Sequence, residues 1–185
     1  RPSLGRVILA VEVNRAPQTI LAEDGNPFEP TWPLAEVALA PDFQSLKDRE
    51  GLKTLAVFGD AAALGAARFP ETARPGESIT IQLTWQAQRS AGESWQRFVH
   101  LDDGNRAQPK VVAQSDGIPA NGYGPNWWQA GDVVPDTIVL ALPTDVLPGQ
   151  YALWVGLTIP NGPRVAILGG DNQDGRLRLG TIAIQ

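Results

Sequence analysis

The chain has one histidine, and the residues near it are of the types that a hydrolytic site uses. His100 lies in "RFVHLDD" and is followed by Asp102 and Asp103, while Ser115–Asp116 belong to a later run. A Ser-His-Asp triad needs convergent side chains together with a nucleophile elbow or an oxyanion loop, and the sequence has neither pattern. Alternation places His100 and Asp102 on one strand face. We therefore expect a hydrogen-bonded strand histidine and no catalytic residues, with a hydrolase around His100 as the weaker hypothesis.

Side chains that bind metals through nitrogen or sulfur are also scarce. One histidine and no cysteine leave too few nitrogen and sulfur ligands for zinc. The loop "GGDNQDG" (Gly169–Gly175) gathers Asp171, Asn172 and Asp174, whose oxygens are of the type that binds Ca²⁺. It lacks the alternating order of a calcium loop and a Glu at the twelfth position, and the same residues are typical of a tight turn. We predict no cofactor and no metal, and keep this loop as a weak Ca²⁺ candidate.

Two adjacent tryptophans suggest a different chemistry, the binding of a sugar ring. They lie in "YGPNWWQAGDVVPD" (Tyr123–Asp136), between turns rich in glycine and proline. An exposed aromatic ring offers a flat apolar face for stacking, and side-chain amides nearby can bind hydroxyl groups. The candidate ligand-binding residues are Tyr123, Asn126, Trp127, Gln129 and Trp154, with Asn121 as a further amide. The alternative is that the loop is a lid that closes the end of a β-sandwich.

Strand parity separates the tryptophans from one another. Trp85 has the inward parity of its strand, and we expect it in the core because an indole buries a large apolar area. Trp154 has the outward parity, so it either faces solvent or is covered by the connector. In an extended backbone Trp127 and Trp128 point to opposite sides. We expect Trp128 to be packed, and the exposure of Trp127 then decides between a platform and a lid.

Composition limits the classes of partner. The 185 residues include 19 glycines and 16 prolines, and the formal net charge is −5. Since binding to the nucleic-acid backbone needs a basic face, nucleic acid is excluded as a main partner. No apolar run reaches the roughly 20 residues that span a bilayer, so we expect no membrane insertion by this chain. The sequence begins at Arg1 and contains no Met, which suggests a processed chain or a piece of a larger protein.

Alternating apolar and polar residues dominate the rest of the chain and predict strands. "SITIQLTWQ" (Ser78–Gln86) is the clearest example, with its apolar residues on one face. A change of parity at Gly180 predicts a β-bulge in the last strand. The remaining predicted strands are Leu55–Phe58, Leu64–Phe69, Gln96–Leu101, Val111–Ser115, Thr137–Leu142, Tyr151–Leu157, Val165–Leu168 and Leu177–Ile184. The fold class is therefore all-β, an Ig-like or fibronectin-III-like Greek-key sandwich of two antiparallel sheets.

Two further segments define the domain organisation. "DVLPGQY" has the form of a tyrosine corner, in which the Tyr151 hydroxyl bonds a backbone group upstream. Residues 14–54 are rich in proline and read as an irregular connector with one short helix near Asp42–Glu50. Ser3–Val13 is predicted as a strand, either of this sandwich or of a preceding module. We divide the chain into an N-terminal strand and connector, 1–54, and an Ig-like sandwich, 55–185.

Several pieces of the sandwich together resemble a known family. They are "FGD" (Phe58–Asp60), "PGESITIQLTWQA" (Pro75–Ala87), "FVHL" (Phe98–Leu101) and "WQAGD" (Trp128–Asp132). The chain from Leu55 to Gln185 is similar to bacterial extracytoplasmic Ig-like modules of uncharacterised function. Some of these are attached to membrane proteins that resemble glycosyltransferases. The aromatic residue that the family commonly has after Gly65 is missing here, and the family supplies no catalytic residues to carry over.

The resemblance implies a non-catalytic interaction or spacer module of a larger exported or membrane-associated bacterial protein, located outside the cytoplasm. Its partners would be carbohydrate or neighbouring domains of that protein. The alternative is a carbohydrate-binding module that uses the Tyr123–Gln129 loop. We assign structural roles to Trp85, Trp128 and Tyr151. An exposed Trp127 beside a groove favours the binding module, whereas two packed loop tryptophans favour the spacer.

Overall fold

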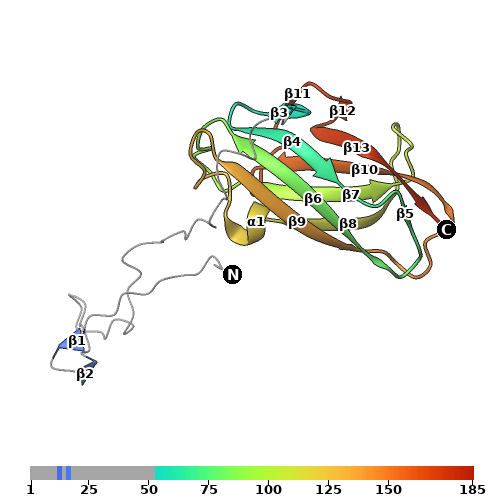
Figure 1. The fold of residues 1–185 in the computed structure, drawn as a ribbon, viewed down its shortest axis with the longest axis horizontal. Coiled ribbons are helices and arrows are strands. Elements are labelled where there is room, and N and C mark those ends of the chain that lie inside the picture. Colours follow the sequence, from blue (N-terminus) through green and yellow to red (C-terminus); the bar gives the residue numbers. More distant parts are fainter. Residues whose placement is uncertain (1–11, 14–15, 18–52) are drawn as a thin grey trace. The chain divides into compact units, whose positions relative to one another are not determined.

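The computed structural model describes residues 12–13, 16–17 and 53–185 (Figure 1). The chain divides into two compact units, Arg1–Pro41 and Asp42–Gln185. In the first unit β1 (Glu12–Val13) pairs antiparallel with β2 (Ala16–Pro17), as a sheet of its own. Outside this pair, the predicted N-terminal strand and the connector with its short helix lie outside the described residues.

In the described part of the second unit, the regular secondary structure is almost entirely strand, in agreement with the predicted fold class. The helix described there is the four-residue α1 (Pro119–Gly122). Among the described residues no helix is long and apolar enough to cross a membrane. The strands are β3 (Ala56–Phe58), β4 (Ala62–Arg68), β5 (Thr72–Ala73), β6 (Ser78–Ala87), β7 (Gln96–Asp102), β8 (Val111–Gly117), β9 (Val133–Ala141), β10 (Gly149–Thr158), β11 (Ile167–Leu168), β12 (Asn172–Gln173) and β13 (Arg176–Ile184).

These strands form two stacked sheets of an Ig-like sandwich. One sheet has the order β11-β3-β4-β6-β9, and the other has the order β12-β13-β10-β7-β8 with β5 parallel to the end of β13. The chain changes sheet on entering and leaving β5, between β6 and β7, between β8 and β9, between β9 and β10, and on entering and leaving β11. Figure 1 shows β4, β6 and β9 in front of β7 and β10. Apart from the β5–β13 pair, the pairings within the sandwich are antiparallel.

The core between the sheets follows the predicted alternation. The burial of β6 alternates strictly over its first six residues, with Ile79, Ile81 and Leu83 buried. Trp85 is fully buried, as predicted, and packs edge-on against Phe58 with the ring centroids 5.2 Å apart. Burial of large apolar side chains from both sheets is the main force that holds the layers together.

Two predicted local features are confirmed. The Tyr151 hydroxyl donates a hydrogen bond to the Leu147 carbonyl at 2.9 Å, which is the tyrosine corner at the start of β10. The register of β10 with β13 shifts where Leu153 pairs with Gly180 and Trp154 with Arg178, so Leu179 is the extra residue of a β-bulge. Both features fix how β10 and β13 cross the sandwich.

Strand β9 begins at Val133, four residues earlier than predicted, because Pro135 is tolerated at the edge of the sheet. Leu142 N donates to the Glu77 carbonyl and Ala87 N donates to the Asp132 carbonyl, and the register between β6 and β9 is unbroken. The even-numbered residues of β9 therefore turn their backbone groups toward β6. Pro135 lies at an odd position, so its missing N–H faces the free edge and removes no hydrogen bond from the ladder.

Candidate functional site

The residues of the hypothetical triad do not converge. His100 pairs with Trp154 on one side and with Gln114 on the other, and Ser115 pairs with Val99, the residue before His100. Because adjacent strand residues point to opposite faces, the side chains of Ser115 and His100 lie on opposite sides of the sheet. The prediction that His100 and Asp102 share a face is confirmed by the register.

His100 has the environment of a packed strand residue. Its ring lies 4.9 Å from that of Phe98 between centroids and is half-buried. Burial lowers the pKa of His100; the carboxylate of Asp116 opposes this shift, and the guanidinium of Arg164 adds to it. The imidazole is therefore mainly neutral at neutral pH.

The Asp102 carboxylate makes structural hydrogen bonds. It is 1% exposed and accepts a hydrogen bond from Trp154 Nε1 at 3.0 Å and another from Arg176 Nη1 at 3.0 Å. The guanidinium carbon of Arg176 also lies 4.6 Å from the centre of the Trp154 ring, in cation–π geometry. The expectation that Trp154 is available to a ligand is wrong, since this outward-facing indole is only 1% exposed.

Two loops meet beside Trp154, on the outer face of the sheet. The Arg106 guanidinium lies 5.8 Å from the Trp154 ring centre and donates to both carboxylate oxygens of Asp171 at 2.6 and 2.7 Å. Gln173 Nε2 donates to the Arg106 carbonyl at 2.9 Å. Parity alone could not show this cover, because it depends on a loop that is 65 residues away from Arg106 in the sequence.

The weak calcium candidate lies in the second of these loops. Asp171 is paired with Arg106, and the Asn172 amide donates to the Gly169 carbonyl at 2.9 Å. Asp174 adopts a left-handed backbone with φ of 52°, as a turn residue does. Within the described residues no group of three or more His, Cys, Asp or Glu side chains gathers to hold a metal ion. The loop contributes an ion pair and a turn.

The double-tryptophan loop is held by hydrogen bonds among its own residues. Trp128 is 1% exposed, as expected, and its Nε1 donates to the Tyr123 carbonyl at 2.8 Å. The single proton of the Tyr123 hydroxyl is shared between the Trp127 carbonyl at 3.1 Å and Asp132 Oδ2 at 3.3 Å, while Gln129 N donates to the same carboxylate oxygen at 2.9 Å. Tyr123 is only 4% exposed, so its expected place in a stacking platform is wrong. Its phenol instead fixes the loop.

Trp127 is the aromatic residue of this loop that reaches solvent. Its side chain is 38% exposed, and Gln129 and Asn121 are exposed as well. Asn126 is half-buried, and its carbonyl accepts a hydrogen bond from Ser90 Oγ at 2.9 Å. The predicted platform of several rings is therefore reduced to one ring with polar neighbours. A ligand-binding role for this ring stays a prediction.

The sequence interpretation missed a buried ionic group beneath this end of the sandwich. Asp136 is 3% exposed and accepts hydrogen bonds from Trp85 Nε1 at 3.3 Å and from Ala120 N at 3.0 Å. Arg97 Nε lies 3.6 Å from the same carboxylate. Both charged residues stand at inward parity among apolar neighbours, and this pattern in "VVPDTIVL" and "QRFVHL" was the signal that could have revealed them.

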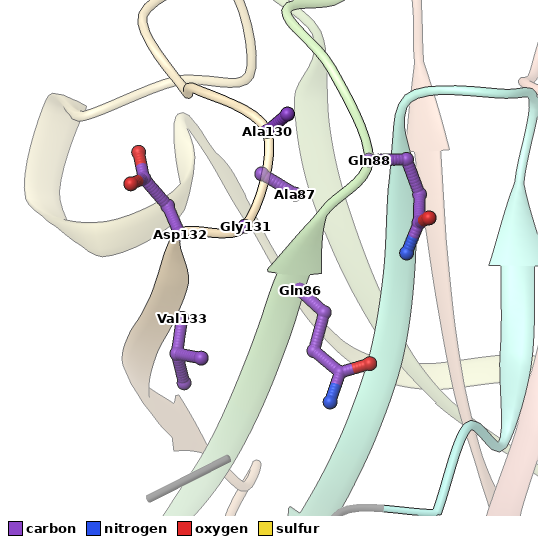
Figure 2. A pocket seen from close by; sticks show the side chains of 7 residues that line it. All are labelled: Gln86, Ala87, Gln88, Ala130, Gly131, Asp132 and Val133. Carbon is purple, nitrogen blue, oxygen red and sulfur yellow. The ribbon is translucent and has the colours of Figure 1, made fainter. Parts of the chain in front are cut away.

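A pocket opens at the end of β6. Its volume is about 470 Å³, and its lining residues are Gln86, Ala87, Gln88, Ala130, Gly131, Asp132 and Val133. Figure 2 shows the carboxyl group of Asp132 pointing away from the amides of Gln86 and Gln88. That orientation agrees with the bonds of Asp132 to Gln129 and Tyr123. The sequence interpretation did not select this pocket, because Gln86 and Gln88 read simply as solvent-facing residues of a strand and its end.

No known protein family and no curated protein matches the chain. Among solved structures, a Niemann-Pick type C2 protein from the Japanese carpenter ant has a TM-score of 0.44 and 5% identity, covering 70% of this chain and 99% of that one. The CARDB domain of a Pyrococcus furiosus protein, in complex with di-metal ions, has a TM-score of 0.37 and 8% identity, covering 74% and 97%. A β-glucosidase from Listeria innocua has a TM-score of 0.37 and 16% identity, and the match covers 66% of this chain but 16% of that enzyme.

Proposed function

We propose that the sandwich is a non-catalytic interaction or spacer module of a larger exported or membrane-associated bacterial protein. The observation that carries the proposal is the use of the buried carboxylates. Asp102 and Asp136 each accept a hydrogen bond from a buried tryptophan and lie beside an arginine. Carboxylates that are buried and paired in this way are not presented to a substrate. The extracytoplasmic location is inferred from the family resemblance.

The path of the backbone supports a spacer role. Gly170 lies between the Leu55 carbonyl and the side chain of Leu177, at the start of β13. Gln185 N donates to the Ala73 carbonyl just beyond the end of the same strand. Leu55 and Gln185 therefore lie near opposite ends of β13, a strand of 9 residues. Segments joined at these two points would be kept apart by the sandwich.

The direct test is an assay for hydrolysis with the complete 185-residue chain. We expect no turnover of chromogenic ester and glycoside substrates above the level of a His100→Ala variant. Turnover that disappears in His100→Ala would overturn the proposal, because it would assign chemistry to the residue that the structure places beside Phe98. Protease accessibility of the module on intact bacterial cells that make it tests the proposed location, and full protection would contradict it.

The second candidate function is carbohydrate binding through the Tyr123–Gln129 loop. The observation that favours it is the 38% exposure of Trp127, next to exposed Gln129. The exposed indole offers an apolar face for stacking, and the amide offers a donor and an acceptor. Titration of tryptophan fluorescence with oligosaccharides should show saturable quenching that is absent in Trp127→Ala. The loss of Trp127 without any effect on binding would remove this candidate.

A further inference from the structure

The outer face of the sheet that contains β4, β6 and β9 is nearly free of charge. Its β6 row consists of Ser78, Thr80, Gln82, Thr84 and Gln86, which are exposed or half-buried. The neighbouring β9 row contributes Pro135, Thr137 and Val139, which lie directly opposite Thr84, Gln82 and Thr80. Among the outward residues of these three strands, the charged one is Arg68 at the end of β4. In a chain that is 19% charged, this face stands out as polar and neutral.

The pocket lies at one end of this face. Two of its lining residues, Gln86 and Val133, are a cross-strand pair between β6 and β9. The volume of about 470 Å³ is within the range of small-molecule sites. Ala87, Ala130 and Val133 supply small apolar surfaces, and Gln86 and Gln88 supply the polar side chains on the side away from the loop (Figure 2).

The two amides are available for a ligand. No hydrogen bond joins the side chain of Gln86 or Gln88 to another residue of the described part of the chain. Gln86 is half-buried and lies over Gly65, where the Gln86 amide nitrogen would be 3.2 Å from an added Cβ atom. Because Gly65 has no side chain, it leaves room for this amide at the wall of the pocket. Each amide offers two N–H donors and one carbonyl acceptor.

The chemistry of the lining selects a class of ligand. None of the seven lining residues is basic, so an anionic group would find no counter-charge. The single acidic residue, Asp132, accepts hydrogen bonds from Gln129 N and the Tyr123 hydroxyl, and its carboxyl group points away from the amides. Paired donors and acceptors beside small apolar surfaces match a neutral molecule that carries several hydroxyl groups on a carbon ring.

We propose that this pocket binds one ring of a neutral oligosaccharide, with the Gln86 and Gln88 amides bonding its hydroxyl groups and the chain continuing over Thr84 and Gln82. The site is distinct from the Trp127 loop, and the proposal rests on the non-catalytic function proposed above. Side chains of one strand face recur about every 7 Å. A ligand of several linked rings can therefore bond this row at more than one point, which a single free sugar cannot do.

The experiment is a calorimetric titration of the complete chain with neutral hexasaccharides of glucose, mannose and xylose, and with a uronic-acid hexasaccharide. We expect at least one neutral hexasaccharide to bind more tightly than its monosaccharide and than the uronate. The double variant Gln86→Ala/Gln88→Ala should weaken that binding by about tenfold or more, as expected for lost hydrogen bonds. The matched control is Gln114→Ala, an exposed glutamine on the other sheet, which should leave the affinity unchanged.

Two other results would overturn the proposed pocket. Binding that survives the double variant but is lost in Trp127→Ala would overturn the pocket and leave the loop as the site. No binding of any neutral hexasaccharide to a chain with an unchanged Tm would also overturn the pocket, while the non-catalytic function would stand. Chromatography of the titrated sugars separates the two proposals, because cleavage of a hexasaccharide would contradict the non-catalytic function itself.

Discussion

Asp136 shows how a charged residue can be a core residue of this sandwich. It sits at inward parity in β9, where its carboxylate is shared by the indole of Trp85 and the backbone of α1 at Ala120. Arg97 approaches from the other sheet, with its Nε 3.6 Å away. Burial lowers the pKa of Arg97, and the charge of Asp136 opposes that shift. The pair thus compensates two buried charges and ties both sheets to α1.

The first prediction is that Asp136→Asn destabilises the fold strongly. Removing the negative charge leaves Arg97 buried without its counter-charge, which typically costs about 3–5 kcal/mol. Urea denaturation followed by tryptophan fluorescence measures the free energy of unfolding. Asp145→Asn, at an exposed position, is the matched control and should change it by less than about 0.5 kcal/mol. Equal stability of the two variants would show that the Arg97–Asp136 pair contributes little.

Tyr123 gives the second prediction, which concerns pH. Burial, followed by the nearby charge of Asp132, raises the pKa of Tyr123 to about 12, whereas the unfolded value is about 10. Between these values the unfolded chain loses the phenolic proton and the folded chain keeps it. The free energy of unfolding should therefore fall as pH rises from about 10 to about 12.

The comparison protein is Tyr123→Phe, which has no phenolic proton. Its stability at pH 8 should be about 1 kcal/mol lower, since the hydrogen bonds to Asp132 and the Trp127 carbonyl are lost. Its decline with alkaline pH should be shallower than that of the natural chain. Denaturation curves at pH 8, 10 and 11 measure both effects, and parallel declines in the two proteins would contradict the buried phenol.

At the scale of elements, β10 is buried on both of its faces. Tyr151, Leu153, Val155 and Leu157 face the core, while Trp154 lies under the arginines of the opposite face. Gly156 makes this close cover possible. A Cβ atom at Gly156 would overlap the Phe98 ring and come within 2.6 Å of the Gly175 carbonyl oxygen. The loop before β13 can therefore lie directly on β10 only where β10 has no side chain.

The third prediction follows from this contact. Gly156→Ala should lower the free energy of unfolding by about 1–3 kcal/mol, as overpacking does. Gly149→Ala, in the first position of the same strand, is the control, because an added Cβ would meet only a Tyr151 ring carbon at an ordinary 3.6 Å. Thermal unfolding by circular dichroism compares the two. An unchanged Tm for Gly156→Ala would mean that the loop over β10 shifts freely.

The sequence predicted the long strands well, but it did not predict which side chains and loops cover the outer faces of the sheets. The alternation in β6 and β10 reports which residues face the core, and that is a local property of each strand. The short strands β5 and β12 exist because of their neighbours, so local pattern does not reveal them. The burial of Trp154 likewise depends on Arg106 and Asp171, which only the folded chain brings together. For the loop, Trp128 was predicted correctly and Tyr123 was not.

At the scale of the whole sandwich, the two outer faces differ in kind. The face of β7, β10 and β13 is sealed by an aromatic and ionic layer that includes Trp154, Arg176 and Asp102. The face of β4, β6 and β9 carries short neutral side chains such as Thr80 and Thr137. The buried layer on one face contributes to the stability of the sandwich, while the opposite face presents neutral polar side chains to solvent. The amino-acid composition does not reveal this asymmetry, because the outward residues of both sheets alternate with core residues in the same way.

Pro135 bears on how the module behaves when many copies are crowded together. At this position the missing N–H faces the free side of β9, and Val139, further along the same strand, is 62% exposed. An uninterrupted edge of this kind would be a template on which the β9 strand of another molecule could add itself, the first step of ordered aggregation. Pro135 removes one backbone N–H donor from the free edge and removes no hydrogen bond between β6 and β9. Because β9 begins at Val133 and so includes Pro135, its free edge is protected against pairing with another copy.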